Sequence, residues 1–408
     1  MPPSGKGLNA KSRLRVVDWL TVLLAISLPW STSATGILLV VWLVAVVFTL
    51  TPEDRDILVT PAGGLPVLLV LLGIAGMAWA DVSFAERWGG LDSFLKLLFV
   101  PLMFMHFRWS RHTTIVFAGY ALSCIALLCT SYAIAALHMQ LTQDPGVPVK
   151  NAATQSGEFA TCMFGFAYLA SDWIARRKWA WAAGAIVLIL AMFANMVFVA
   201  TGRTALVIVA VLLVLFVALH LTWRGIALVA AGVALVVAVA WVSSPYLRYR
   251  TETLWTDLQV SGATGARTSS GERMEFARRS LEFIREAPLF GHGTGTIHTL
   301  FEKAAAGKTG TAGVAAANPH NQTFAVGIQL GFVGIAVLWA MWIAHLLLFR
   351  GPGLVAWIGV VVVVQNVVGS LFNSHLFDFL QGWTYVVGVG VAGGIMLREH
   401  AKRSGSVL

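Results

Sequence analysis

One histidine and a small set of arginines are the residues of this chain whose type and position could do chemistry. His320 stands in Asn318-Pro319-His320-Asn321, where Asn at the N-cap and Pro at the first helical position predict the start of a helix. The positive end of that helix lowers the pKa of a histidine in its first turn, so the imidazole stays neutral and can accept a proton. His320 therefore suits a general base, although a lone histidine at such a boundary is more often an interfacial polar residue.

A helix that carries several charges precedes His320. Ser269 with Glu272 three residues later matches a capping box, and Pro288 with the glycines after it predicts the end of the helix. On a helical wheel the acidic residues and Arg279 share a solvated arc, whereas Arg273 projects from the centre of the opposite, apolar arc. Arg273 must therefore meet an anion there, unless its stem only covers apolar surface.

Further polar residues lie at the ends of apolar runs. Arg203 occupies a short turn between two of them, on the side where positive charge is otherwise avoided, and such exceptions are functional hypotheses. Tyr246 and Arg248 follow the ninth run, where they could hold phosphates, although juxtamembrane arginines commonly bind lipid headgroups. His292 lies in a stretch whose alternate glycines could present amides to an anion, but a turn that ends a helix has the same composition. We count His292 and Asn321 among the substrate-binding residues.

These residue types favour an anionic substrate. Guanidinium groups match phosphate oxygens, so arginines can stabilise a diphosphate leaving group without a metal. The acidic residues outside the charged helix are scattered and include no Asp-x-Asp pair. The sequence therefore predicts a metal-free reaction without a cofactor.

The composition places these residues on a membrane protein. Apolar residues make up 58% of the 408 residues and charged residues only 12%, which excludes an ordinary soluble domain. The net charge of +9 could indicate nucleic acid binding, but the cations gather at the ends of apolar runs. The three cysteines lie inside such runs and predict no disulfide framework.

Twelve runs are long enough to cross a bilayer, so we predict an all-α polytopic membrane protein. They cover residues 16–33, 36–51, 65–80, 93–108, 113–138, 157–175, 178–199, 204–222, 225–243, 321–349, 353–372 and 376–397. The organisation predicted is residues 1–243 with nine helices, a periplasmic loop at 244–320, three helices at 321–397 and a cytoplasmic tail at 398–408. Cations are abundant in the segments on one side and rare in the short loops on the other, where only Arg87, Lys150 and Arg203 occur. This bias predicts that both termini are cytoplasmic.

In their order along the chain, these motifs resemble the O-antigen ligase family. The resemblance rests on SGER at 270–273, APLFGHG at 287–293 and PHN at 319–321, with TGRT at 201–204 as a looser match. Family members often carry an aromatic residue, frequently Trp, shortly after the loop arginine, and here Phe276 stands nearby. His320, Arg273 and Arg203 match the family's essential histidine and its two arginines.

The resemblance implies a GT-C-like glycosyltransferase of the bacterial inner membrane that inverts the anomeric carbon. Such an enzyme transfers O-antigen polysaccharide from undecaprenyl diphosphate to the lipid A–core oligosaccharide on the periplasmic face, which completes lipopolysaccharide. Its partners are these two substrates and membrane lipids, with no nucleic acid, and we expect a monomer.

Three other functions remain open. An O-antigen polymerase shares the fold group but tends to carry two large arginine-rich loops, whereas the segment 139–156 is short. A protein O-oligosaccharyltransferase usually has a longer carboxy-terminal region, and a lipid-linked oligosaccharide transporter would place more charge in its deep helices. The sequence does not reveal the transferred sugar, the acceptor hydroxyl, or whether residues 303–317 form an ordered wall or a mobile lid.

Overall fold

The computed structural model describes residues 8–110, 113–243 and 269–403, and all regular elements in these ranges are helices. The long helices are α1 (Leu8–Ser27), α2 (Thr32–Val47), α4 (Pro61–Gly76), α5 (Phe84–Leu95), α6 (Phe99–Phe107), α7 (Thr113–Ala136), α8 (Ala152–Ala175), α9 (Trp179–Phe198), α10 (Arg203–His220), α11 (Trp223–Ser243), α13 (Ser269–Glu286), α15 (Gln322–Leu348), α16 (Leu354–Gly369) and α17 (Phe379–Arg403). The short ones are η1 (Pro52–Arg55), α3 (Asp56–Val59), η2 (Lys96–Leu98), α14 (Ile297–Ala305) and η3 (Gly310–Gly313).

A helix lies over each of the twelve apolar runs, and α5, η2 and α6 together form one of them. Within the described residues, six helices are long and apolar enough to cross a membrane, and a sharply bent pair, α2 with residues 52–59, could make a seventh. The apolar helices α4 and α16 are shorter than this criterion requires. The structure is therefore consistent with a helical membrane protein, and the number of twelve crossings stays a prediction.

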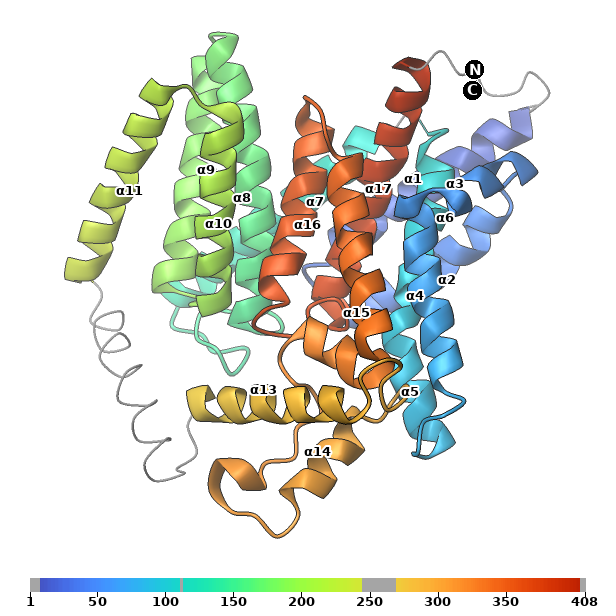
Figure 1. The fold of residues 1–408 in the computed structure, drawn as a ribbon. Coiled ribbons are helices and arrows are strands. Elements are labelled where there is room, and N and C mark those ends of the chain that lie inside the picture. The colour runs from blue at the N-terminus through green and yellow to red at the C-terminus, as the bar shows by residue number, and fades with distance from the viewer. Residues whose placement is uncertain (1–7, 111–112, 244–268, 404–408) are drawn as a thin grey trace.

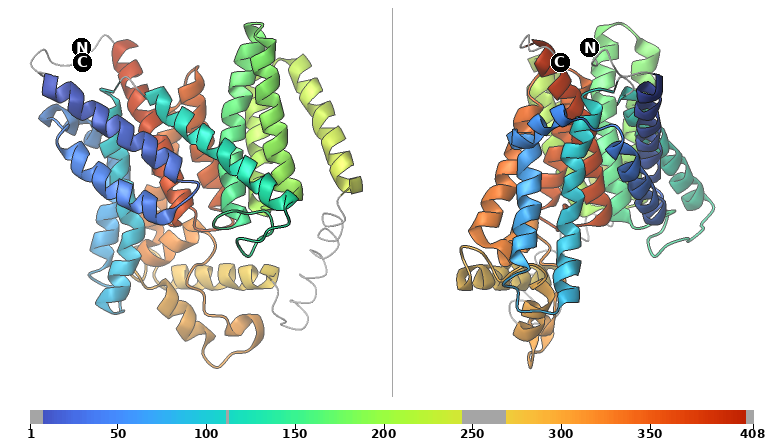
Figure 2. Two further views of the ribbon diagram at one scale, coloured as in Figure 1. Left: turned by 180° about the vertical axis from the view of Figure 1, so that it is seen from behind. Right: turned by 90° about the vertical axis from the view of Figure 1, so that its right-hand side faces the viewer.

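The helices form a bundle with one elaborated end (Figure 1). The beginning of α1 and the end of α17 lie at one end of the bundle, and α13 lies across the opposite end with α14 beyond it (Figures 1 and 2). This arrangement puts the helix predicted at 269–286 on the face opposite the termini. Which face is periplasmic stays a prediction from the charge bias.

Close helix contacts hold the bundle together. Glycines of α17 face α6, and a Cβ at Gly393 would come within 2.1 Å of the Phe104 ring. Lys96 lies in the 3₁₀ turn between α5 and α6. Its Nζ donates hydrogen bonds of 3.0 Å to the carbonyls of Phe377 and Asp378. The buried ammonium thus ties α5 and α6 to the loop before α17, and its charge is partly satisfied there.

The helix α15 is broken at Gly331, and the segment after α13 fills the break. Gly331 has φ 62° and ψ −157°, a conformation that glycine adopts at little cost. The freed amides of Phe332 and Val333 donate to the carbonyls of Pro288 and Leu289. The contact is so close that a Cβ at Gly331 would lie 2.4 Å from Leu289. The break therefore fixes the end of α13 against α15.

The glycine-rich stretch 291–295 completes this contact and offers no anion nest. Its backbone amides donate in turn to the carbonyl of Ala287, the carbonyls of Ile328 and Gln329, the carbonyl of Gly76, and the side-chain oxygen of Gln329. Every amide of the stretch is used within the protein. The interpretation of these glycines as a turn that ends the helix is confirmed. The alternative, a nest of amides that binds an anion, is not supported.

Candidate active site

Arg203 is the first residue of α10, in the turn where the sequence places it. The turn rests on α8, because the Ser156 hydroxyl donates to the carbonyl of Ala200 at 2.8 Å. Gly202 lies against the same serine, where a Cβ would come within 2.8 Å of it. The Arg203 side chain is exposed, and it donates no hydrogen bond to another described residue. The turn is therefore rigid while its guanidinium is free to bind a ligand.

The helix α13 confirms the predicted position of a helix but not its predicted orientation. Arg279, which the wheel places on the solvated face, is 1% exposed and pairs with Glu275 at 2.8 Å. Arg273, predicted at the centre of the buried face, is exposed. The wheel prediction is wrong because residues 306–316 cover the acidic side of α13, where the carbonyl of Ala312 accepts from Arg279. Arg273 therefore lies at the edge of the buried face and not at its centre.

His320 lies just before α15, because the helix begins three residues later than predicted. The N-cap of α15 is Asn321, whose side chain accepts from the amide of Phe324 at 3.1 Å. Asn318 instead accepts the backbone N–H of His320 at 2.8 Å, and this turn holds His320 at φ 54°. A positive φ is uncommon for a residue other than glycine and costs about 1–3 kcal/mol. The surrounding loop thus imposes the position of the imidazole.

A hydrogen bond from the loop after α16 orients the imidazole. The side-chain oxygen of Asn373 accepts from Nδ2 of Asn318 at 2.9 Å and lies 3.2 Å from Nδ1 of His320. Because this oxygen is an acceptor, Nδ1 must carry the proton, and Nε2 is left with a lone pair. The ring of Phe276 stacks on the imidazole with centroids 6.0 Å apart and a tilt of 21°. Nε2 of His320 makes no hydrogen bond to any described residue and is available as a base.

Electrostatic interactions connect His320, Arg273 and Arg203. Burial lowers the pKa of His320, and the cation of Arg273 lowers it further, while the Asn373 hydrogen bond and the charge of Glu272 raise it. The predicted direction is thus confirmed, but its main cause is burial and not a helix terminus. Burial and the neighbouring Arg203 lower the pKa of Arg273. The structure therefore brings the imidazole of His320 near Arg273, and Arg273 near Arg203, from segments far apart in the sequence.

The other predicted substrate-binding residues either have structural roles or lie outside the described residues. Nε2 of His292 is 2.8 Å from the carbonyl of Phe283, so this histidine satisfies the end of α13. Asn321 is engaged as the cap of α15, and its Nδ2 donates to the carbonyl of Leu371. Tyr246 and Arg248 fall outside the described residues. Their role in binding substrate stays a prediction.

A polar cavity of about 600 Å³ adjoins the histidine loop. Its walls come from α5, the loop before α14, residues 317–319, the first turns of α15 and the loop before α17. Asn318 and Ser374 line it, and both also hydrogen-bond within the histidine loop. His320 and the two arginines do not line it. The cavity therefore flanks the cationic cluster without enclosing it.

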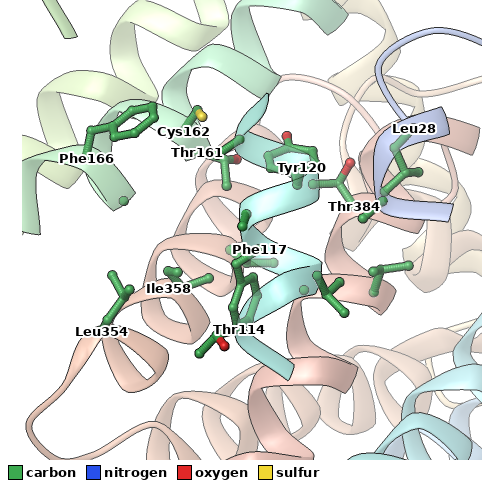
Figure 3. A pocket seen from close by; sticks show the side chains of 18 of the residues that line it. Leu28, Thr114, Phe117, Tyr120, Thr161, Cys162, Phe166, Leu354, Ile358 and Thr384 are labelled. Carbon is green, nitrogen blue, oxygen red and sulfur yellow. The ribbon is translucent and has the colours of Figure 1, made fainter. Parts of the chain in front are cut away.

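A second cavity, of about 200 Å³, lies among α1, α7, α8, α16 and α17 (Figure 3). Its lining is apolar apart from the hydroxyls of a few side chains, among them Tyr120, Thr161 and Thr384. None of the predicted site residues lines this cavity. It is therefore separate from the cationic cluster.

Residues 303–317, left open between wall and lid, pack against α13 in the structure. Ala316 is buried with Phe276 and Phe301 in a small apolar cluster, and η3 contacts α13.

Asn373 is the site residue that sequence reasoning missed. The polar run Asn373-Ser374-His375 between two apolar segments was the signal that could have shown it. The described residues contain no group of three or more His, Cys, Asp or Glu side chains placed to share a metal ion.

The fold and this cluster define a class: a helical membrane protein with a cationic site at one end of its bundle. Residues 189–339 match the family model described as O-Antigen ligase, and this range contains Arg203, Arg273 and His320. This match supports the resemblance to the O-antigen ligase family that the sequence motifs indicate. No curated protein matches the chain. The family suggests a ligase of the glycosyltransferase kind with a role related to lipopolysaccharide.

Proposed function

We propose that this protein transfers O-antigen polysaccharide from undecaprenyl diphosphate to a hydroxyl of the lipid A–core oligosaccharide on the periplasmic face. The proposal is supported by the positions of three residues: Arg203 begins α10, Arg273 lies on α13 and His320 precedes α15. The charge of Arg203 acts on Arg273 and that of Arg273 acts on His320, and α13 lies across the end of the bundle opposite the termini (Figure 1). The charges of Arg203 and Arg273 repel each other, and no described carboxylate raises the pKa of Arg273. An anion bound between the two guanidinium groups would therefore be stabilised. A lipid diphosphate supplies such an anion.

The proposed reaction is a direct displacement at the anomeric carbon. The acceptor hydroxyl attacks this carbon and gives its proton to Nε2 of His320, while the bond from the carbon to the diphosphate oxygen breaks. The leaving diphosphate carries the developing negative charge, and Arg273 and Arg203 neutralise it. Attack opposite the leaving group inverts the anomeric configuration. Asn373 contributes by keeping the proton of the free enzyme on Nδ1, so that Nε2 is the basic nitrogen.

Replacement of His320 tests the proposal. In a strain lacking its ligase, His320→Ala and His320→Asn should leave bare lipid A–core and accumulate polymerised donor, since neither variant has a base. His320→Asn matters because asparagine tolerates the left-handed backbone, so a folding defect of the alanine variant would not confuse the result. Exposed His138, with φ 53°, provides the matched control, and His138→Ala should ligate normally.

Lipopolysaccharide gels and an assay of the lipid-linked donor in these strains separate the related functions. Core capped with single units in the absence of this protein would indicate an O-antigen polymerase, and loss of donor from the outer leaflet would indicate a transporter. Normal ligation by well-expressed His320→Ala and His320→Asn would remove the histidine from the mechanism.

A further inference from the structure

The polar cavity beside the histidine loop has no role in the reaction as described above. It lies between α5 and the loops before α14 and α17, with Gly89, Ser93 and Asp378 among its walls. Its volume of about 600 Å³ falls within the range of small-molecule binding sites. Asn318 connects it to the base, because this side chain lines the cavity and also accepts the backbone N–H of His320.

The lining groups suit a neutral polyhydroxyl compound. Glu86 and Asp378 place two carboxylates on the lining, and these repel phosphates. The oxygens of Glu86 already accept hydrogen bonds from Ser83 and Thr299, so Asp378 is the carboxylate that can accept from a ligand hydroxyl, and His298 also lines the cavity. Ser93 and Ser374 add hydroxyls, and Phe377 adds an aromatic ring. Gly89 leaves part of the α5 wall without a side chain, and no atom lies within 4 Å of where its Cβ would be, whereas Gly90 packs closely against Gly295. An anionic ligand would face two carboxylates here, whereas the arginines lie elsewhere.

The position of the cavity also separates it from the arginines. Arg203 lies on α10 and the cavity has a wall on α5, and these two helices stand at opposite sides of the bundle with α13 across the end (Figures 1 and 2). In a displacement the attacking oxygen enters opposite the leaving group. If the arginines hold the leaving diphosphate, the attacking sugar comes from the other side of the histidine loop, which is where the cavity lies.

We propose that this cavity binds the neutral saccharide end of the acceptor oligosaccharide and delivers its hydroxyl to His320. The inference rests on the proposed function and names the acceptor subsite of the same reaction. The cavity discriminates against phosphorylated sugars, so the acceptor end that reaches the base is uncharged.

Filling the cavity tests the assignment. A Cβ at Gly89 meets no atom within 4 Å, so Gly89→Phe places a ring in the cavity mouth without a backbone clash. Gly184 on α9 is equally open and exposed, and Gly184→Phe is the matched control because it is remote from the cavity. Ser93→Leu fills the cavity from a second position. We expect Gly89→Phe and Ser93→Leu to raise the KM for lipid A–core by about tenfold, with the KM for the lipid-linked donor unchanged.

A binding measurement keeps the inference independent of catalysis. Saturation-transfer NMR with the purified protein would use delipidated neutral core oligosaccharide and, separately, a phosphorylated core fragment. We expect the neutral probe to bind the wild type and the Gly184→Phe control but not Gly89→Phe, and the phosphorylated probe not to bind. An unchanged acceptor KM, a rise in donor KM instead, or equal binding of both probes would overturn the assignment. If the wild type fails to ligate yet binds the neutral probe at this cavity, the proposed function fails while the saccharide site stands.

Discussion

Asn373 offers the sharpest test of how His320 is set up as a base. Among the described residues its side-chain oxygen is the acceptor of the Nδ1 proton, at 3.2 Å. Asn373→Ala leaves this half-buried donor without its partner, which costs about 1–3 kcal/mol. It also lets the proton move to Nε2, where it blocks the base. We therefore expect kcat to fall by about 5-fold to 150-fold, with little change in either KM.

The pH dependence distinguishes orientation from mere stability. The groups that act on His320 are Asn373 and Glu272, which raise its pKa, and Arg273, which lowers it together with burial. Since the neutral imidazole is the active form, activity is lost as the pH falls through the pKa of His320. Asn373→Ala removes a contact that raises the pKa, so the acid limb of the pH–rate profile should move to lower pH.

Asn373→Asp should have the opposite effect on the same profile. Its carboxylate accepts the Nδ1 proton and favours the imidazolium, so the acid limb should move up by about one pH unit or more, while kcat at high pH largely recovers. The assay is ligation by purified protein at saturating donor and acceptor, with exposed Leu371→Ala of the same loop as control. If both Asn373 variants move the limb in the same direction, or neither moves it, the orientation of His320 by Asn373 is refuted.

Three further predictions concern the arginines, metals and the broken helix. Arg273→Lys keeps the positive charge but loses the planar fork of the guanidinium, so the KM for the donor should rise by about tenfold. Arg278→Lys, at an exposed position of the same helix, should leave this KM unchanged. Steady-state kinetics with varied donor concentration would measure both effects. Exhaustive chelation should leave the ligation rate unchanged, and recovery of a lost rate by added magnesium would contradict the arginine account. Gly331→Ala should lower the thermal unfolding midpoint in detergent, because strain at φ 62° costs about 1–3 kcal/mol and the new Cβ would also clash with Leu289. Gly89→Ala is the control and should leave the midpoint unchanged, because no atom lies within 4 Å of the new Cβ.

The sequence predicts the helices of this protein well because each is defined by local composition. A run of apolar residues forms a helix wherever it lies, and the twelve runs coincide with helices in the structure. The same holds for the end of α13 at Glu286 before Pro288. Such signals depend on neighbours in the chain and need no knowledge of tertiary contacts.

The sequence predictions are wrong where contacts between distant segments determine the local structure. Asn318 matches an N-cap by its neighbours, but its side chain bonds Asn373, 55 residues away, and the helix starts after Asn321 instead. Arg279 belongs to the solvated face of an isolated helix, yet residues 306–316 fold over it. A helical wheel treats the helix in isolation, so it cannot show that a loop covers the polar side. Asn373 itself could not be linked to His320, because nothing in the sequence gives the distance between the two loops.

The position of His320 depends on long-range constraints that also explain its strained backbone. His320 is held at φ 54° between a turn closed by Asn318 and a helix cap made by Asn321. The amide of Gln322, one residue further, donates to the carbonyl of Ser370 at 2.9 Å, which joins this turn to the loop that carries Asn373. Asn373, which accepts the hydrogen bond from the imidazole, and Phe276, which stacks on it, are thus in place before a substrate arrives. The ring does not need to reorient during the reaction. In its proposed role as a base, His320 would gain rate from this preorganisation, and the stability of the bundle would offset the strain at one residue.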